Sequence, residues 1–301
     1  MESTGATPLR ARSLGALATF SRALPPLRGK GALARALMAQ AEQRRELAGS
    51  WSLRIKDGTR FELPRASRQT WAVAFDGLYD PAAVAYVERF VRPGSVVLDV
   101  GASLGLWTVP LARMAAARGA QVWAFEPNPA NIEWITRNVE LNGLQDYVTV
   151  RGVGLGDRPE EVTLVSSEYG VGNGVIAVGE SESTEKFLHV QVRIERLDDI
   201  ELPAPVSFVK IDTEGYEPAF LRGAAGLIAR ERPVIFGEFA PVWMRARGED
   251  LRGELREMAY DVAALEASRS HRWRSIDTVA RRPLDRDGSA PLPANLLLTP
   301  S

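Results

Sequence analysis

The chain has 301 residues, 45% hydrophobic and 25% charged, a composition typical of a globular protein with a large core. It has no cysteine and only two histidines, which excludes disulfides, thiolate nucleophiles and cysteine-ligated zinc or iron–sulfur sites. Any metal here would be a hard cation held by carboxylates. No stretch reaches the roughly 18 apolar residues of a membrane span. We therefore expect a soluble, cytoplasmic protein; the oligomeric state stays open.

The net charge of −1 is unevenly distributed. Residues 1–70 hold thirteen basic and five acidic side chains, a net charge of +8, and the remainder carries −9. Two interpretations stay open. The basic region is either a solvated arm or a surface for an acidic partner, such as a phosphorylated carrier, a nucleic acid or a membrane.

The N-terminal third lacks the regular alternation of strand and helix patterns that is typical of a large α/β domain. Residues 1–29 mix Ser, Thr, Gly, Pro and Arg with little periodicity, which predicts a flexible tail. Apolar residues then recur at helical spacing over residues 31–47, which predicts a short amphipathic helix. Alternating apolar residues flank Asp57-Gly58, which predicts a β-hairpin. Residues 30–90 are therefore expected to form a cap or lid, followed by one domain over residues 91–301.

From residue 95 onward, strands alternate with helices. Continuous apolar runs predict buried strands at residues 95–100, 121–125, 148–153, 206–211 and 234–239, with further strands at 261–265 and 295–299. Helical patterns cover residues 106–118, 129–141 and 217–230. Asn128 is the expected N-cap of the second helix, and Asn142-Gly143 its end. This alternation predicts an α/β fold with a mostly parallel sheet, in which ligands bind beyond the carboxyl ends of the strands.

The first of these strands runs into the loop Asp99-Val100-Gly101-Ala102-Ser103-Leu104-Gly105. Glycines allow a sharp turn and let the backbone approach a ligand with no Cβ in the way. The spacing differs from the dinucleotide pattern G-x-G-x-x-G. In addition, the carboxylate of Asp99 would repel a pyrophosphate but not an ammonium or sulfonium ligand. A glycine turn without a ligand is the alternative.

The second strand ends at Glu126, followed by Pro127 and Asn128. An acidic side chain at this tip is placed to accept both hydroxyl hydrogens of a ribose. The alternatives are a solvated glutamate, or a carboxylate favoured by the N-terminus of the next helix.

These segments together resemble the FkbM family of S-adenosylmethionine-dependent methyltransferases. The resemblance covers residues 75–239 and rests on VVLDVGASLGLWT, VWAFEPNPANIEWITRNVELNGL, VGLGD, RLDDI, FVKIDTEGYEPAFLRGA and VIFGEF, with Gly77-Leu78-Tyr79 upstream. It implies a class I methyltransferase fold, which is a Rossmann-like, seven-stranded, mostly parallel sheet with an antiparallel C-terminal hairpin. It also implies that S-adenosylmethionine is the cofactor.

The resemblance assigns a side of the cofactor to each matched segment. Asp99, Gly101, Ala102 and Gly105 would hold the methionine side, Glu126 and Pro127 the ribose, and Gly152, Val153 and Asp157 would lie near the adenine. Asp212 completes the set at the strand that faces the transferred methyl group.

The segment Lys210-Ile211-Asp212-Thr213-Glu214-Gly215-Tyr216-Glu217 carries the candidate catalytic residues. Amine- and base-methylating relatives often have an Asn/Asp-Pro-Pro-aromatic motif here, which this chain lacks. Asp212 and Glu214, with Glu238 from the next strand, could deprotonate or orient a hydroxyl, or could bind Mg²⁺. The alternative is that Asp212 and Glu214 only cap the following helix.

We therefore predict O-methylation of a hydroxyl on a small molecule, sugar or natural product, acceptors with which the FkbM family is associated. The competing classes are an RNA or DNA methyltransferase and a non-catalytic module that binds the cofactor. The isoelectric point of about 6.3 argues against nucleic acid. Residues 162–192 break the alternation and form either part of the substrate pocket or a glycine-rich hairpin loop. For His271 a surface loop is preferred over a catalytic role.

Overall fold

The structure is a computed structural model. It describes residues 30–43, 47–55, 57–76, 81–167, 172, 175–176, 187–239, 248, 251–267, 279–283 and 295–301. The chain divides into two compact units, Met1–Tyr79 and Asp80–Ser301, and each is described by itself. Residues 81–90 thus belong to the larger unit.

The smaller unit combines two helices with a β-hairpin: α2 (Lys30–Gln43), β1 (Ser50–Arg54), β2 (Arg60–Pro64) and α3 (Arg68–Asp76). The hairpin prediction is confirmed, because β1 and β2 pair antiparallel and Gly58 has a φ of +88°. The backbone N–H of Thr59 donates to Asp57 Oδ1 at 2.9 Å, which closes the turn. Helix α3 was not predicted, because its short apolar run is equally compatible with a strand.

The larger unit is built on an eight-stranded sheet in the order β13-β12-β14-β11-β10-β3-β4-β5. The strands are β3 (Val96–Val100), β4 (Gln121–Phe125), β5 (Val148–Arg151), β10 (Val206–Ile211), β11 (Val234–Glu238), β12 (Tyr260–Ala267), β13 (Val279–Pro283) and β14 (Asn295–Pro300). Five neighbouring strands of this sheet, β11, β10, β3, β4 and β5, are parallel. Strand β14 lies between β11 and β12 and is antiparallel to both. This is the predicted class I methyltransferase sheet, with β13 added as an eighth strand beside β12.

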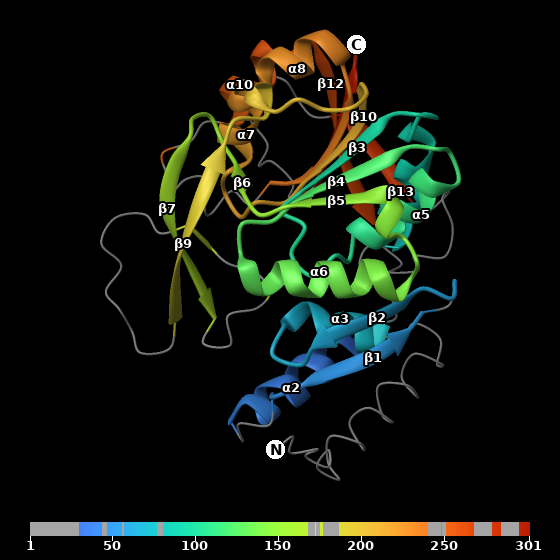
Figure 1. Cartoon of the computed structure of the whole chain (residues 1–301), viewed down its shortest axis with the longest axis vertical. Coiled ribbons are helices and arrows are strands. Elements are labelled where there is room, and N and C mark those ends of the chain that lie inside the picture. Colours follow the sequence, from blue (N-terminus) through green and yellow to red (C-terminus); the bar gives the residue numbers. More distant parts are fainter. Residues whose placement is uncertain are drawn as a thin grey trace. The chain divides into compact units, whose positions relative to one another are not determined.

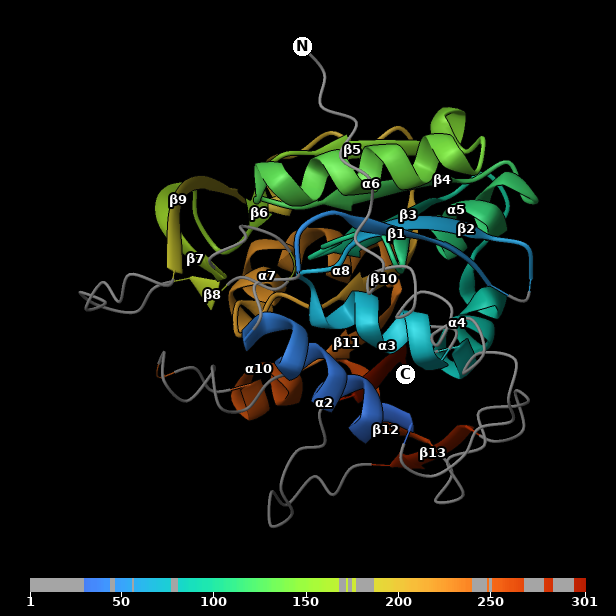
Figure 2. The ribbon, with the colours of Figure 1, turned by 90° about the horizontal axis from the view of Figure 1, so that it is seen from below.

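Helices cover both faces of this sheet (Figures 1 and 2). The helices are α4 (Pro81–Val87), α5 (Thr108–Ala116), α6 (Pro129–Leu141), α7 (Glu217–Gly223), α8 (Ala225–Glu231) and α10 (Leu251–Glu257), with short 3₁₀ turns at Glu88–Phe90, Gln145–Tyr147 and Leu197–Asp199. Helix α6 lies on the face opposite α7, α8 and α10 (Figure 1). Within the described residues, no helix combines the length and apolar character needed to cross a membrane.

The continuous helix predicted over residues 217–230 is wrong at one point, because α7 ends at Gly223 and α8 begins at Ala225. The chain comes very close to another segment here. A Cβ on Gly223 would overlap the carbonyl oxygen of Gly156. The break thus occurs where the helix backbone packs directly against the loop after β6 (Gly154–Leu155).

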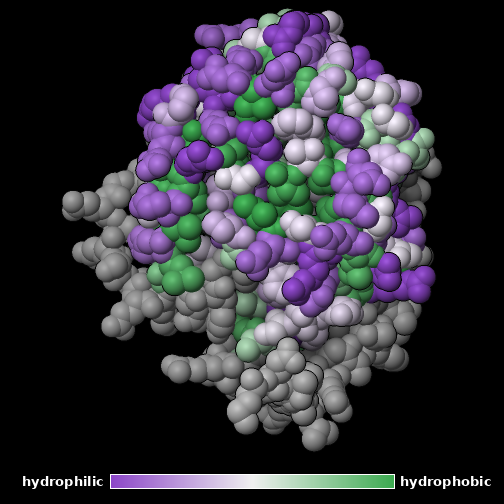
Figure 3. Space-filling view, viewed as in Figure 1, coloured by the Kyte–Doolittle hydropathy of each residue, from purple (hydrophilic) through white to green (hydrophobic). Residues whose placement is uncertain are grey.

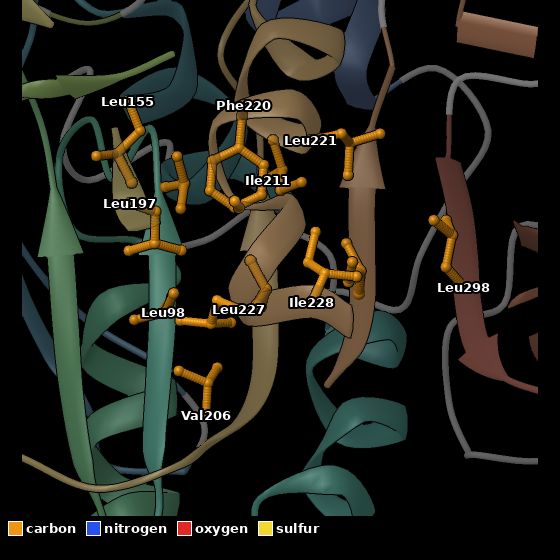
Figure 4. Close-up of a cluster of buried hydrophobic side chains, with 14 of the residues drawn as sticks. Leu98, Leu155, Leu197, Val206, Ile211, Phe220, Leu221, Leu227, Ile228 and Leu298 are labelled. Atoms are coloured by element: carbon orange, nitrogen blue, oxygen red, sulfur yellow. The ribbon is translucent and has the colours of Figure 1, made fainter. Parts of the chain in front are cut away.

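A large hydrophobic cluster lies between the sheet and helices α7 and α8. Leu98 and Ile211 from the sheet face Phe220, Leu227 and Ile228 from the two helices (Figure 4). Every side chain of β3 and β10 is buried, which explains their continuous apolar sequences. The ionisable residues in these two strands, Asp99 and Lys210, must therefore find their partners inside the protein.

One irregularity sets the register of β10 against β3. Val206 lies opposite Val96 and Phe208 opposite Val97, so that Ser207 is an extra residue in β10. Its hydroxyl is 2.7 Å from the hydroxyl of Ser95. Beyond this bulge, Lys210 lies opposite Asp99.

A second, four-stranded sheet occupies the region where the alternation was expected to break. Its order is β6-β9-β7-β8, with β7 (Glu160–Ser167), β8 (Val175–Ile176) and β9 (Phe187–Glu195). Strands β7 and β9 form a long antiparallel pair beside the main sheet (Figure 2). On the face shown in Figure 3, hydrophilic and hydrophobic residues are interspersed.

Candidate functional site

The loop after β3 depends on two glycines with positive φ, Gly101 at +77° and Gly105 at +80°. A Cβ on Gly101 would overlap the backbone carbonyl of Asp212, and one on Gly105 would lie 3.4 Å from the Cα of Ile135 in α6. The N–H groups of Gly101 and Ala102 donate to the carbonyl of Phe125 at 3.0 and 3.1 Å. The glycines therefore let this loop fit between the ends of β4 and β10 and helix α6.

Glu126, at the end of β4, is buried and accepts three hydrogen bonds. The backbone N–H of Ser103 donates to Oε2 at 2.8 Å, and the backbone N–H of Asn128 donates to Oε1 at 2.9 Å. The side chain of Asn131 also donates to Oε1, at 3.2 Å. Burial raises the pKa of Glu126, and these donors act against the rise. The carboxylate is thus fixed between the glycine loop and the start of α6, and it is not a solvated loop residue.

The loop after β5 lies next to Pro127. A Cβ on Gly154 would be 3.7 Å from the Pro127 ring, and one on Gly152 would be 3.2 Å from the Ile132 side chain. Val153 between them is buried. The loops expected at the ribose and at the adenine are therefore neighbours.

Asp157 is held differently from the other expected cofactor residues. Its Oδ2 is 3.0 Å from Arg222 Nη2 in α7, and Arg222 Nη1 is 2.8 Å from Glu254 in α10. This ion pair ties the loop after β6 to the helices. The Asp157 carboxylate is therefore engaged in an ion pair with Arg222 within the protein.

Lys210 is a buried cation among the acidic residues of the site. Its Nζ is 3.3 Å from Asp212 Oδ2, 3.9 Å from Asp99 Oδ1 and 3.4 Å from the carbonyl oxygen of Gly101. Burial acts to lower the pKa of Lys210, but the carboxylates of Asp212, Asp99 and Glu238 outweigh it and raise this pKa. Lys210 therefore stays protonated and links the glycine loop to the start of the Asp212 segment.

Asp99 is fully buried, so its carboxylate has to find its partners inside the protein. The hydroxyl of Thr108 donates to Asp99 Oδ2 at 2.7 Å. Among the described residues, no hydrogen-bond donor reaches Asp99 Oδ1, whose charged neighbour is Lys210. Burial raises the pKa of Asp99, while Lys210 and Thr108 oppose this rise.

The segment after β10 is organised by Glu217. Its Oε1 accepts hydrogen bonds from the backbone and hydroxyl of Thr213, at 2.9 and 3.0 Å, and the backbone N–H of Gly215 donates to both of its carboxylate oxygens. Helix α7 begins after Tyr216, whose side chain makes no cap hydrogen bond. Glu214 itself has a φ of +51°, a strained value for a residue with a side chain.

The geometry offers little to a metal ion. Within the part of the chain that the structure describes, no three His, Cys, Asp or Glu side chains are grouped so that they could hold one. The acidic residues instead surround the Lys210 ammonium, which would repel a second cation. The Mg²⁺ alternative at Asp212, Glu214 and Glu238 therefore gains no support from the structure.

S-adenosylmethionine, the cofactor implied by the fold, fits these residues. Two glycines with positive φ leave the backbone of the first loop open, and a buried carboxylate stands at the next strand end. His271 lies outside the described residues, and so do residues 168–171, 173–174 and 177–186 of the segment 162–192, so the predictions for them are untested.

Sequence reasoning missed three polar residues that shape the site: Lys210, Asn131 and Glu217. A signal for Lys210 was present, since a lone lysine in a continuous apolar strand must be paired when buried. Asn131 lies four residues before the core residue Ile135, and so on the buried face of its helix. Glu217 was expected only as the start of a helix.

Comparison with known proteins is consistent with this geometry. The sequence profile of the Methyltransferase FkbM domain matches residues 99–262. Ribosomal protein L11 methyltransferase from Syntrophomonas wolfei is 30% identical over 88 residues, 29% of this chain and 27% of that protein. The protein of the same name from Chloroflexus aurantiacus is 34% identical over 84 residues, 28% of this chain and 25% of that protein. The chain thus matches about a quarter of the length of these relatives.

Among solved structures, methyltransferase FkbM from Methylobacillus flagellatus aligns with a TM-score of 0.44 and 16% identity, covering 77% of this chain and 54% of that one. The profile match begins at Asp99 of the glycine loop and ends in β12, and it spans more than half of the chain. The chain therefore belongs to the FkbM methyltransferase family.

Proposed function

We propose that this chain transfers the methyl group of S-adenosylmethionine to a hydroxyl oxygen of a small molecule, such as a sugar or a natural product. One observation carries the proposal. The glycine loop, the buried Glu126 and the Asp212 backbone come together at the carboxyl ends of β3, β4 and β10. Brought together in this way, they provide a cofactor site with carboxylates beside it.

Bound S-adenosylmethionine supplies a sulfonium methyl group that is already electrophilic. The protein therefore has to align the acceptor oxygen and exclude water. In this proposal Glu126 holds the ribose hydroxyls, and the loop of Gly101 to Gly105 holds the methionine part.

Asp212 is the proposed catalytic carboxylate. Its Oδ2 lies 3.3 Å from the ammonium of Lys210. An ionised carboxylate can accept the hydrogen of an acceptor hydroxyl and orient its oxygen, and general-base help of this kind is worth roughly 10²–10⁴-fold in rate. Glu214 and Glu238 are candidates for the same task.

The test uses purified protein, isotopically labelled S-adenosylmethionine and separate small-molecule, protein and nucleic-acid fractions of a cell extract. We expect label in a hydroxylated small molecule. Label only in protein or nucleic acid would contradict the proposed acceptor class, and binding without any transfer would favour a non-catalytic module.

Asp212→Asn keeps the shape of the side chain but removes its charge. We expect a large loss of methylation rate with little loss of S-adenosylhomocysteine affinity, while Asp199→Asn, at an exposed position of a 3₁₀ turn, stays at the wild-type rate. Near-normal turnover of both Asp212→Asn and Glu214→Gln would remove these carboxylates from the mechanism. Treatment with EDTA should have no effect, whereas inactivation reversed by Mg²⁺ would support the metal alternative.

A further inference from the structure

Asn131 connects the ribose carboxylate to a distant segment of the chain. It lies in the first turn of α6 and is only 2% exposed. Its Nδ2 donates to Glu126 Oε1 at 3.2 Å and to the carbonyl of Gly172 at 2.9 Å, and its Oδ1 accepts from the N–H of Gly172 at 2.9 Å. This network fixes the orientation of the amide, because a flipped amide would face two acceptors with its oxygen.

Gly172 lies between β7 and β8, outside the βα units that carry the other loops of the site. It is buried and has a φ of +86°, a conformation that glycine adopts without strain. Its two hydrogen bonds to Asn131 resemble the two-point pairing of neighbouring strands. A continuous series of contacts thus runs from Gly172 through Asn131 to Glu126, and from Glu126 to the N–H of Ser103 in the glycine loop.

A buried carboxylate depends on each of its donors, because burial without hydrogen bonds is costly. Asn131 supplies the side-chain donor to Oε1 of Glu126, so it helps to set the direction in which the free lone pairs of that oxygen point. Asn131 in turn is held by both polar backbone groups of Gly172.

We propose that Asn131 is a positioning residue for the cofactor, and that Gly172 contributes to cofactor affinity through Asn131. Gly172 is thereby part of the cofactor site, although the strands on either side of it belong to the second sheet. This inference rests on the proposed role of Glu126 at the ribose.

The experiment measures S-adenosylhomocysteine affinity by calorimetry for the full chain and for Asn131→Ala, Gly172→Ala and the double variant. We expect each single variant to bind about tenfold more weakly, the scale of one hydrogen bond to a charged group. The double variant should bind no more weakly than Asn131→Ala, because Gly172 acts through Asn131. Thr136→Ala is the control on the same helix, since the Thr136 hydroxyl is exposed and donates to the Ile132 carbonyl.

A purely structural Asn131 would give a different pattern: a lower melting temperature of the ligand-free variant with unchanged affinity, and that result overturns the proposal. Additive losses in the double variant would overturn the route through Asn131. Gly172→Asn tolerates positive φ better than alanine, so it should keep more affinity, and it serves as the test if Gly172→Ala does not fold.

The two proposals fail in different ways. No binding of S-adenosylhomocysteine by the wild type contradicts the proposed function. Binding by the wild type that is lost in Glu126→Ala but unchanged in Asn131→Ala contradicts only the present inference.

Discussion

At the scale of single residues, the proposed contact of Glu126 with the ribose can be tested directly. Replacing it by alanine removes a buried carboxylate that is fixed by three donors. We expect S-adenosylhomocysteine affinity to fall by about 1.5–3 kcal/mol, the scale of hydrogen bonds to a charged group. Calorimetry of the purified variant measures this, and wild-type affinity in Glu126→Ala would remove this residue from the ribose.

Folding stability and S-adenosylhomocysteine affinity should depend in opposite ways on the protonation of Glu126. Burial raises the folded-state pKa of Glu126 above its ordinary value of 4.5. Its contribution to stability is therefore fully present below the ordinary pKa and is lost as the pH rises through the raised value. The ligand needs the ionised form, so S-adenosylhomocysteine affinity should fall as the pH falls through that raised pKa. Binding titrations at a series of pH values measure this change in affinity. An affinity that rises on acidification would contradict the prediction.

Lys210 carries the largest expected stability effect. Lys210→Met would leave the carboxylates of Asp99 and Asp212 without their buried cation. Breaking a buried ion pair in this way costs about 3–5 kcal/mol of unfolding free energy. Arg230→Met is the matched control, because the exposed pair of Arg230 with Glu231 is worth about 1 kcal/mol or less. Urea unfolding measures both, and equal losses would contradict the buried role of Lys210.

At the scale of elements, helix α6 is fixed at both ends by its sequence. The side chain of Asn128 accepts from the N–H of Ala130, and Gly143 beyond the C-terminus has a φ of +68°. Asn128→Ala and Gly143→Ala should each cost about 1 kcal/mol. The two ends lie about 20 Å apart on a helix of 13 residues, so the losses should add in the double variant, as measured by urea unfolding. Clear non-additivity would show that one end alters the other.

Elements such as α6 could be predicted because their signals are local. Each of these signals spans only a few residues: the N-cap Asn128, the terminating Gly143 and the apolar runs of β3 and β10. The break at Ala224 and the Asn131–Gly172 pairing could not be predicted, because both depend on chain segments far apart in sequence. The candidate site divides in the same way. Its loops were found from glycine spacing, but the ammonium that the acidic residues surround was not.

At the scale of the whole molecule, the two compact units give a calorimetric prediction. The expected cofactor residues all lie in residues 80–301, so S-adenosylhomocysteine should raise the melting temperature of that unit. If the predicted lid of residues 30–90 closes over a bound ligand, the transition of the smaller unit, which holds most of these residues, should rise as well. Trp51 and Trp71 lie in the smaller unit, so the fluorescence of a Trp51→Phe/Trp71→Phe variant reports on the larger unit alone, and its difference from the wild type reports on the smaller one. An unchanged smaller transition would contradict the lid.

Beyond the bulge at Ser207, the partner of Lys210 depends on the length of β10. Deleting one residue between the bulge and Lys210 would place Lys210 opposite Leu98 instead of Asp99, and the ammonium would point to the other face of the sheet. Such a deletion would separate Lys210 from Asp99 without replacing either residue. In lineages of this fold, the length of the strand that carries Lys210 should therefore stay constant between the bulge and the lysine, and residues should be gained or lost elsewhere.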